Sequence, residues 1–192
     1  MRRFLLVVGL SAILVGCRRG GHTLPYGEGY TFVSQRGDTV RLDSLRGKFV
    51  VMTYIYTHCP DACPLTIDNL RKLYAMIPPK FMDTVVFVAI TLDPERDTPE
   101  VLREYARLQK VEHPNWLFLT GEPNTIKKFI RRMGVIAVKE KPRKLENGKV
   151  IYFITHTDYV HIVSPDGRVL FTGDGDHLNV EEALRSLRSN LP

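Results

Sequence analysis

The chain has 192 residues, a formal charge of +6, 44% hydrophobic residues and 25% charged residues. This length and composition predict one globular domain with an ample core. The lysines and arginines are scattered, apart from short runs such as 139–144, so the positive charge favours a solvated surface and argues against nucleic-acid binding.

The N-terminus has the pattern of a secretory signal peptide. Arg2 and Arg3 precede an apolar run over 4–15, which is too short for a comfortable membrane span. Residues 14–17, Leu-Val-Gly-Cys, resemble a bacterial lipobox, which implies cleavage before Cys17 and acylation of its thiol. We expect a signal peptide over 1–16, a tether over 17–29 and a folded domain over 30–192. The protein would then be lipid-anchored in a bacterial cell envelope, on the outer side of a membrane. An uncleaved signal anchor is the alternative.

The domain is expected to begin with a hairpin, whose strands cover 30–33 and 39–42. A near-continuous apolar run over 49–56 then predicts a strand buried on both faces. Apolar residues at helical spacing follow over 67–77, and the run stops at two prolines.

Cys59 and Cys63 lie between this strand and this helix, with Pro64 suited to the first helical turn. Free N–H groups and the helix dipole there predict that both thiols are more acidic than a free cysteine. Three intervening residues favour a bridging metal over a disulfide, which stays feasible. An oxidising compartment would tend to close the pair, so something must reduce it before it acts.

The rest of the chain continues to alternate between strands and helices. Asp97 or Thr98 caps a helix that starts near Pro99 and reaches about residue 110. The other expected strands are 85–92, 116–119, 159–163 and 168–172, with helices at 125–132 and 179–189 and a β-hairpin insertion pairing 135–138 with 150–154. This order predicts an α/β, thioredoxin-like fold, in which ligands bind at the carboxyl ends of the strands, where Cys59 lies.

Two thiolates with an imidazole would suit a soft ion such as Cu(I) or zinc. The chain contains six histidines: His22, His58, His113, His156, His161 and His177. The residues alone leave His156 and His58 as equal candidates, with His161 next. His156 and His161 are five residues apart, so in one regular strand they would face opposite ways and would not both be ligands.

The motif over 57–64, Thr-His-Cys-Pro-Asp-Ala-Cys-Pro, resembles the Sco/SenC family, as do Asp93-to-Pro99, the 116–121 segment and His156-Thr157 ahead of a Pro-Asp-Gly turn. These are thioredoxin-like copper chaperones that help to assemble the CuA centre of cytochrome c oxidase. The resemblance covers roughly 28–190. It implies that Cys59, Cys63 and His156 bind one copper, and that Asp93 belongs to a signature loop near the site. We expect the Asp93 carboxylate to support the metal ligands without binding the metal itself.

The resemblance also implies partners, namely a copper donor and the copper-accepting subunit of the oxidase. Cu(I) would be held by two thiolates and one nitrogen, and Cu(II) would add water or another oxygen ligand. Three features depart from the family pattern. Asp158 and His161 occupy positions that are usually apolar or aromatic, and a lipobox replaces a transmembrane anchor.

The main alternative is a thiol–disulfide oxidoreductase that reduces the cysteines of a copper-accepting partner. A copper chaperone is not an enzyme in the strict sense, but the same two sulfurs could serve both roles. Enzymes of thioredoxin type usually have two residues between the cysteines and a facing cis-proline, whereas this chain has three and no proline over 143–164. A peroxidase is disfavoured, because Tyr56 and Pro60 replace the expected threonine.

Overall fold

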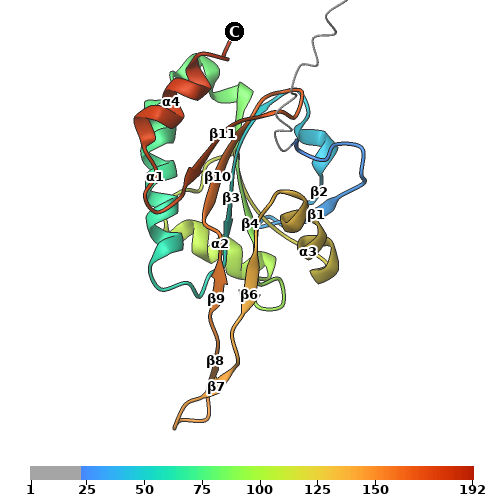
Figure 1. Cartoon of the computed structure of the whole chain (residues 1–192), viewed down its shortest axis with the longest axis vertical. Coiled ribbons are helices and arrows are strands. Elements are labelled where there is room, and N and C mark those ends of the chain that lie inside the picture. Colours follow the sequence, from blue (N-terminus) through green and yellow to red (C-terminus); the bar gives the residue numbers. More distant parts are fainter. Residues whose placement is uncertain (1–22) are drawn as a thin grey trace, which may run out of the picture.

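The computed structural model describes residues 23–192, which form a seven-stranded sheet in the order β11-β10-β3-β4-β5-β1-β2. Three parallel strands make its centre, β3 (Phe49–Ile55), β4 (Val85–Thr91) and β5 (Trp116–Thr120). Antiparallel strands extend both sides: β10 (Tyr159–Val163) pairs with β3, and β1 (Thr31–Ser34) pairs with β5. The edges are β11 (Val169–Asp174) and β2 (Thr39–Arg41) (Figure 1).

Four α-helices connect the strands. They are α1 (Ala62–Met76), α2 (Pro99–Leu108), α3 (Pro123–Arg132) and α4 (Val180–Arg188), with 3₁₀ turns at Leu42–Leu45 and Pro79–Thr84. The first and last helices, α1 and α4, pack side by side (Figure 1). The predicted α/β, thioredoxin-like fold with an N-terminal hairpin is confirmed.

The core explains why the two central strands read as unbroken apolar runs. Every residue of β3 and β4 is buried, because helices or loops cover both faces of a parallel sheet. Phe87 and Trp116 stack across β4 and β5 with ring centroids 4.8 Å apart. This rigid centre carries the loop that follows β3, where the cysteines lie.

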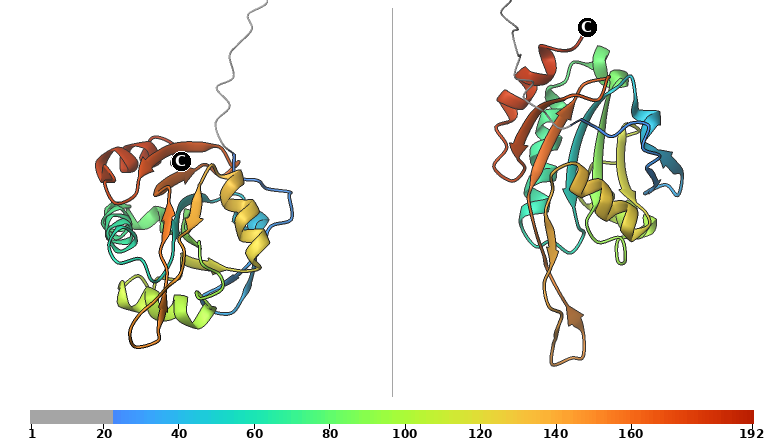
Figure 2. Two further views of the ribbon diagram at one scale, coloured as in Figure 1. Left: turned by 60° about the horizontal axis from the view of Figure 1, so that its bottom comes forward. Right: turned by 45° about the vertical axis from the view of Figure 1, so that its right-hand side comes forward.

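The insertion is a long two-part ribbon that projects from the body (Figure 2). Strand β6 (Ala137–Lys139) pairs with β9 (Ile154–His156), and farther out β7 (Arg143–Lys144) pairs with β8 (Val150–Ile151). A hairpin was predicted correctly, but its register was wrong. The tight turn at Gly148, with φ +80°, closes the hairpin on 143–144, so 150–151 cannot reach 135–138.

The predicted signal peptide, Cys17 and the first residues of the tether lie outside the described residues. The rest of the predicted tether does not hang free. Thr23 forms a β-bridge with Arg168, and Leu24 is buried with 3% of its surface exposed. Within the described residues, the chain thus packs against the body from Thr23 onward, because Leu24 and Tyr26 bury apolar surface there.

Candidate metal centre

Both predicted cysteines lie at the carboxyl end of β3, where the chain turns into α1. The Cys59 N–H donates to the Tyr56 carbonyl at 3.1 Å, and Asp61 caps the helix by accepting from Ala62 N–H at 2.8 Å. Cys63 is the second residue of the helix. Both thiols are free and buried. The strand and the cap thus hold two reduced sulfurs in a water-poor position.

The two sulfurs differ in acidity. The backbone N–H of Cys63 points at the Cys59 sulfur, at 3.3 Å. The Cys63 thiol lowers the pKa of Cys59 to about 4 by donating to its thiolate; burial acts against this, and His156 and the Cys63 N–H add to it. Donation to Cys59, then burial, raises the pKa of Cys63.

The prediction that both thiols are acidic is therefore right for Cys59 and wrong for Cys63. Two neighbouring thiols resist double ionisation, because a second negative charge would meet the first in a buried place. The helix N-terminus does stabilise a thiolate, but the free N–H group of Cys63 donates to the sulfur of Cys59, in the loop before the helix. A metal ion would supply the positive charge needed to ionise both.

His156 reaches this pair from the insertion. It ends β9, where it pairs with Ala137, and its Nε2 lies 3.9 Å from the Cys63 sulfur. Its Nδ1 lies 3.2 Å from the Thr157 carbonyl oxygen. A carbonyl only accepts, so Nδ1 carries the hydrogen and Nε2 is the atom that can bind a metal.

Two contacts hold the imidazole of His156 in a charged, enclosed setting. The Tyr56 ring meets it edge-on, with centroids 6.0 Å apart. Burial lowers the pKa of His156, but the Cys59 thiolate and the Thr157 carbonyl outweigh burial and raise the pKa overall. The Cys59 thiolate therefore favours the protonated form of His156, and a metal bound at Nε2 would compete with that proton.

The donor set fits a soft cation. Metal bonds of about 2.3 Å to sulfur and about 2.0 Å to nitrogen can span a sulfur–nitrogen separation of up to about 4.3 Å. The 3.9 Å between Cys63 and His156 falls within this reach. Two thiolates and one imidazole suit Cu(I) or zinc better than a hard, oxygen-seeking ion.

The other described histidines are engaged elsewhere. His58 is exposed, with Nδ1 3.2 Å from the Thr57 hydroxyl. His161 is buried in β10 beside Tyr54, and its Nδ1 lies 3.0 Å from a β11 hydroxyl. His113 stacks on Tyr74, and His177 lies on the turn after β11. His22 lies outside the described residues. Of the two equal sequence candidates, His156 is thus the one that approaches a sulfur.

Asp93 is buried, and among the described residues its carboxylate forms no hydrogen bond with Cys59, Cys63 or His156. Its carboxylate accepts from Arg96 Nε at 2.8 Å and from the Tyr152 hydroxyl at 2.8 and 2.9 Å. Tyr152 belongs to the insertion that also carries His156. Asp93 therefore joins the loop after β4 to the base of the ribbon, and its supporting role at the metal stays a prediction.

Two other carboxylates were not predicted as site residues. Asp97 is fully buried and accepts from the Thr57 N–H at 3.2 Å and from the hydroxyls of Thr57 and Thr91, both at 2.6 Å. Burial raises the pKa of Asp97, although these hydrogen bonds lower it. The helix cap is Thr98 alone. Asp97 thus ties the cysteine loop to the end of β4, a link between distant segments that helix-cap patterns do not reveal.

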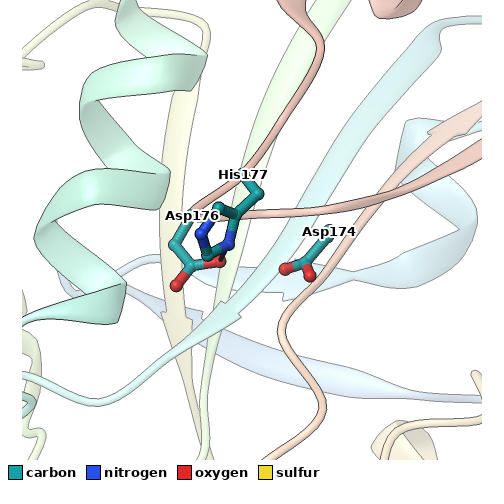
Figure 3. A group of neighbouring side chains, drawn as sticks. All are labelled: Asp174, Asp176 and His177. Atoms are coloured by element: carbon teal, nitrogen blue, oxygen red, sulfur yellow. Dashed lines mark hydrogen bonds and ion pairs between the residues drawn. The ribbon is translucent and has the colours of Figure 1, made fainter.

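Asp158 is the second of these carboxylates. Its Oδ2 accepts from the Thr66 hydroxyl at 2.7 Å and from the Asp176 N–H at 3.0 Å. Asp174, the last residue of β11, lies beside Asp176 and His177 of the following turn (Figure 3), with His177 Nδ1 2.6 Å from Asp176. Asp158 thus joins this exposed group to α1.

None of the helices within residues 23–192 is both long and apolar enough to cross a membrane.

The fold and the site together define a thioredoxin-like protein in which two thiols and one imidazole come together. A family model described as SCO1/SenC matches residues 19–191. The chain therefore belongs to the SCO1/SenC family, as the motifs indicated. A SCO2-like protein of Rickettsia prowazekii is 30% identical over 141 residues, which is 73% of this chain and 65% of that relative. The chain thus spans slightly less than two thirds of that relative's length.

Solved structures resemble the chain over most of its length. ScoI of Bradyrhizobium japonicum with copper bound has a TM-score of 0.70 and 30% identity, covering 85% of this chain and 98% of ScoI. A SCO1/SenC family lipoprotein of Bacillus anthracis has a TM-score of 0.68 and 28% identity, covering 85% of this chain and 93% of the lipoprotein. BsSco has a TM-score of 0.67 and 25% identity, covering 88% of this chain and 94% of BsSco. It is described as having a disulfide switch and as a member of the Sco family of cytochrome c oxidase assembly proteins.

Proposed function

We propose that this protein is a copper-binding metallochaperone that delivers copper to, or prepares, the CuA centre of a cytochrome c oxidase. The observation that carries the proposal is the position of His156 beside two free cysteines, with its Nε2 atom 3.9 Å from the Cys63 sulfur. Relatives with copper bound, and one described as an oxidase assembly protein, support the same function.

Cys59 and Cys63 would bind the copper as thiolates, and His156 would supply nitrogen through Nε2. Three ligands leave room for a partner's ligands, so copper can pass by exchange without becoming fully solvated. The acidic Cys59 would bind first, and ionisation of Cys63 would complete the site as protons leave. The partners would be a copper donor and the copper-accepting subunit of the oxidase.

A second candidate function uses the same sulfurs for thiol–disulfide exchange with a copper-accepting partner. An acidic cysteine beside a protonated one is the arrangement that attacks a disulfide and then resolves the mixed disulfide. The disulfide switch described for BsSco points the same way.

Copper titration of the reduced protein separates the two functions. We expect the wild type to bind one Cu(I) with loss of both free thiols. His156→Ala should weaken Cu(I) binding by at least about a hundredfold, because it removes a ligand, while exchange with a small disulfide persists. His58→Ala is the matched control and should bind as the wild type does.

Two outcomes would count against the proposal. Unchanged copper affinity in His156→Ala would remove His156 from the ligand set. If the reduced wild type took up no copper, thiol–disulfide exchange would become the main function.

A further inference from the structure

Asp158 holds together three segments around the metal centre. It lies two residues after His156, and its Oδ2 accepts from Thr66 on α1, one turn after Cys63. The same oxygen accepts from the Asp176 N–H, and the Asp158 carbonyl accepts from the Gly175 N–H at 2.8 Å. The carboxylate is therefore fixed in position relative to both Cys63 and His156.

The second carboxylate oxygen is left unsatisfied. Asp158 Oδ1 is buried and has no hydrogen-bond partner within residues 23–192. A Cβ on Gly175 would come within 2.5 Å of this oxygen and 2.7 Å of Thr66, so only glycine lets the backbone close over it. Burying a carboxylate oxygen without a partner is unfavourable unless a positive charge lies nearby.

A copper ion bound by Cys59, Cys63 and His156 would supply such a charge, although the two thiolates offset it. The hydrogen bond to Thr66, one turn after Cys63, and the position two residues after His156 bring the Asp158 carboxylate towards both candidate ligands. Two thiolates and Cu(I) carry a net charge of −1, whereas two thiolates and Cu(II) are neutral. A fixed negative charge nearby destabilises the Cu(I) centre, with its net charge of −1, more than the neutral Cu(II) centre. Burial strengthens this effect by weakening the screening of the charges.

We propose that Asp158 is a specificity-determining residue of the metal centre, whose carboxylate raises the affinity for Cu(II) relative to Cu(I). The inference rests on the proposed copper-binding function and deepens it. Soft thiolates alone favour Cu(I), so a carboxylate beside them would shift the balance of affinities towards Cu(II). Asp158 acts through its charge and is not itself a ligand in this proposal.

The test compares the dissociation constants for Cu(II) and Cu(I), measured anaerobically by competition with chromophoric chelators. The variants are Asp158→Asn and Asp158→Leu, which remove the charge with and without a polar group. The matched control is Asp166→Asn, which removes a carboxylate from the turn at the other end of β10. We expect the ratio of Cu(II) to Cu(I) affinity to fall about tenfold in both Asp158 variants and to stay unchanged in the control.

The ratio separates charge from structure, because a loosened site would weaken both ions together. Equal losses for the two ions in both variants would overturn the inference. The outcomes also separate it from the proposed function. If the wild type binds copper and depends on His156, but the Asp158 variants keep its ratio, only this inference fails. If the wild type binds no copper, the proposed function itself fails.

Discussion

At the scale of the residue, the acidity of one sulfur decides how the site reacts. The Cys63 N–H and thiol both point at Cys59, whose pKa falls to about 4, whereas the pKa of Cys63 is raised. Because its pKa is lowered, Cys59 is a thiolate at pH values above about 4 and becomes protonated as the pH falls through that value. Cys59 is therefore the nucleophile at neutral pH, and Cys63 is the protonated partner.

This predicts the pH dependence of alkylation in the metal-free, reduced protein. The rate of Cys59 modification by iodoacetamide should stay level from about pH 8 to about pH 5 and fall about tenfold per unit below its pKa. Cys63 should remain unmodified over this range. Fragment-ion mass spectrometry assigns the two sites, and protein unfolded in guanidinium is the control.

An ordinary thiol, with a pKa near about 8.5, would instead react about tenfold faster for each unit from pH 6 to pH 8. That profile at Cys59 would contradict the hydrogen bonding described for the pair.

The residue scale also shows what spacing could and could not predict. The position of both thiols follows from local signals, an apolar strand and then a helix start, and these were sufficient. Cys63 and His156 are 93 residues apart, and no periodicity relates them. Residue types alone left His58 equal to His156, and only the family motif favoured His156. The protonation of Cys63 depends on the direction of single N–H and S–H groups, which spacing does not specify.

At the scale of the element, loops between strands and helices are tied together by carboxylates. Asp97 receives three hydrogen bonds from Thr57 and Thr91, so it joins the cysteine loop to the end of β4. Strand and helix positions were predicted within a few residues because their periodicity is local. The insertion register was not, since it depends on which residues the Gly148 turn brings opposite each other.

The role of Asp97 predicts a large loss of stability when it is replaced. Asp97→Ala should lower the free energy of unfolding by about 2–4 kcal/mol, because it leaves buried donors of Thr57 and Thr91 without an acceptor. Urea denaturation followed by fluorescence measures this. The neighbouring Thr98→Ala removes only a helix cap and should cost about 1 kcal/mol. Equal losses in the two variants would show that Asp97 does no more than a cap.

At the scale of the whole molecule, the metal centre and the N-terminal end of the fold lie at opposite ends of the β10–β11 pair. Tyr159 pairs with Asp174 at the end near His156, whereas Thr23 bridges Arg168 at the other end. A lipid anchor on Cys17 would thus be joined, through the residues that precede Thr23, to the end of the fold opposite His156. The ribbon of β6–β9 extends the molecule at the site end (Figure 1).

This arrangement predicts that anchoring and copper binding are separable. Cys17→Ser removes the thiol that the lipobox would acylate, so the variant should lose the acyl groups and, with them, cleavage before residue 17. Its Cu(I) affinity should stay within about twofold of the wild type, because the change lies beyond the Thr23 end of the fold. Mass spectrometry of the N-terminus distinguishes the alternatives. A wild type that keeps residues 1–16 would favour an uncleaved signal anchor, and an acylated wild-type Cys17 would favour the lipoprotein.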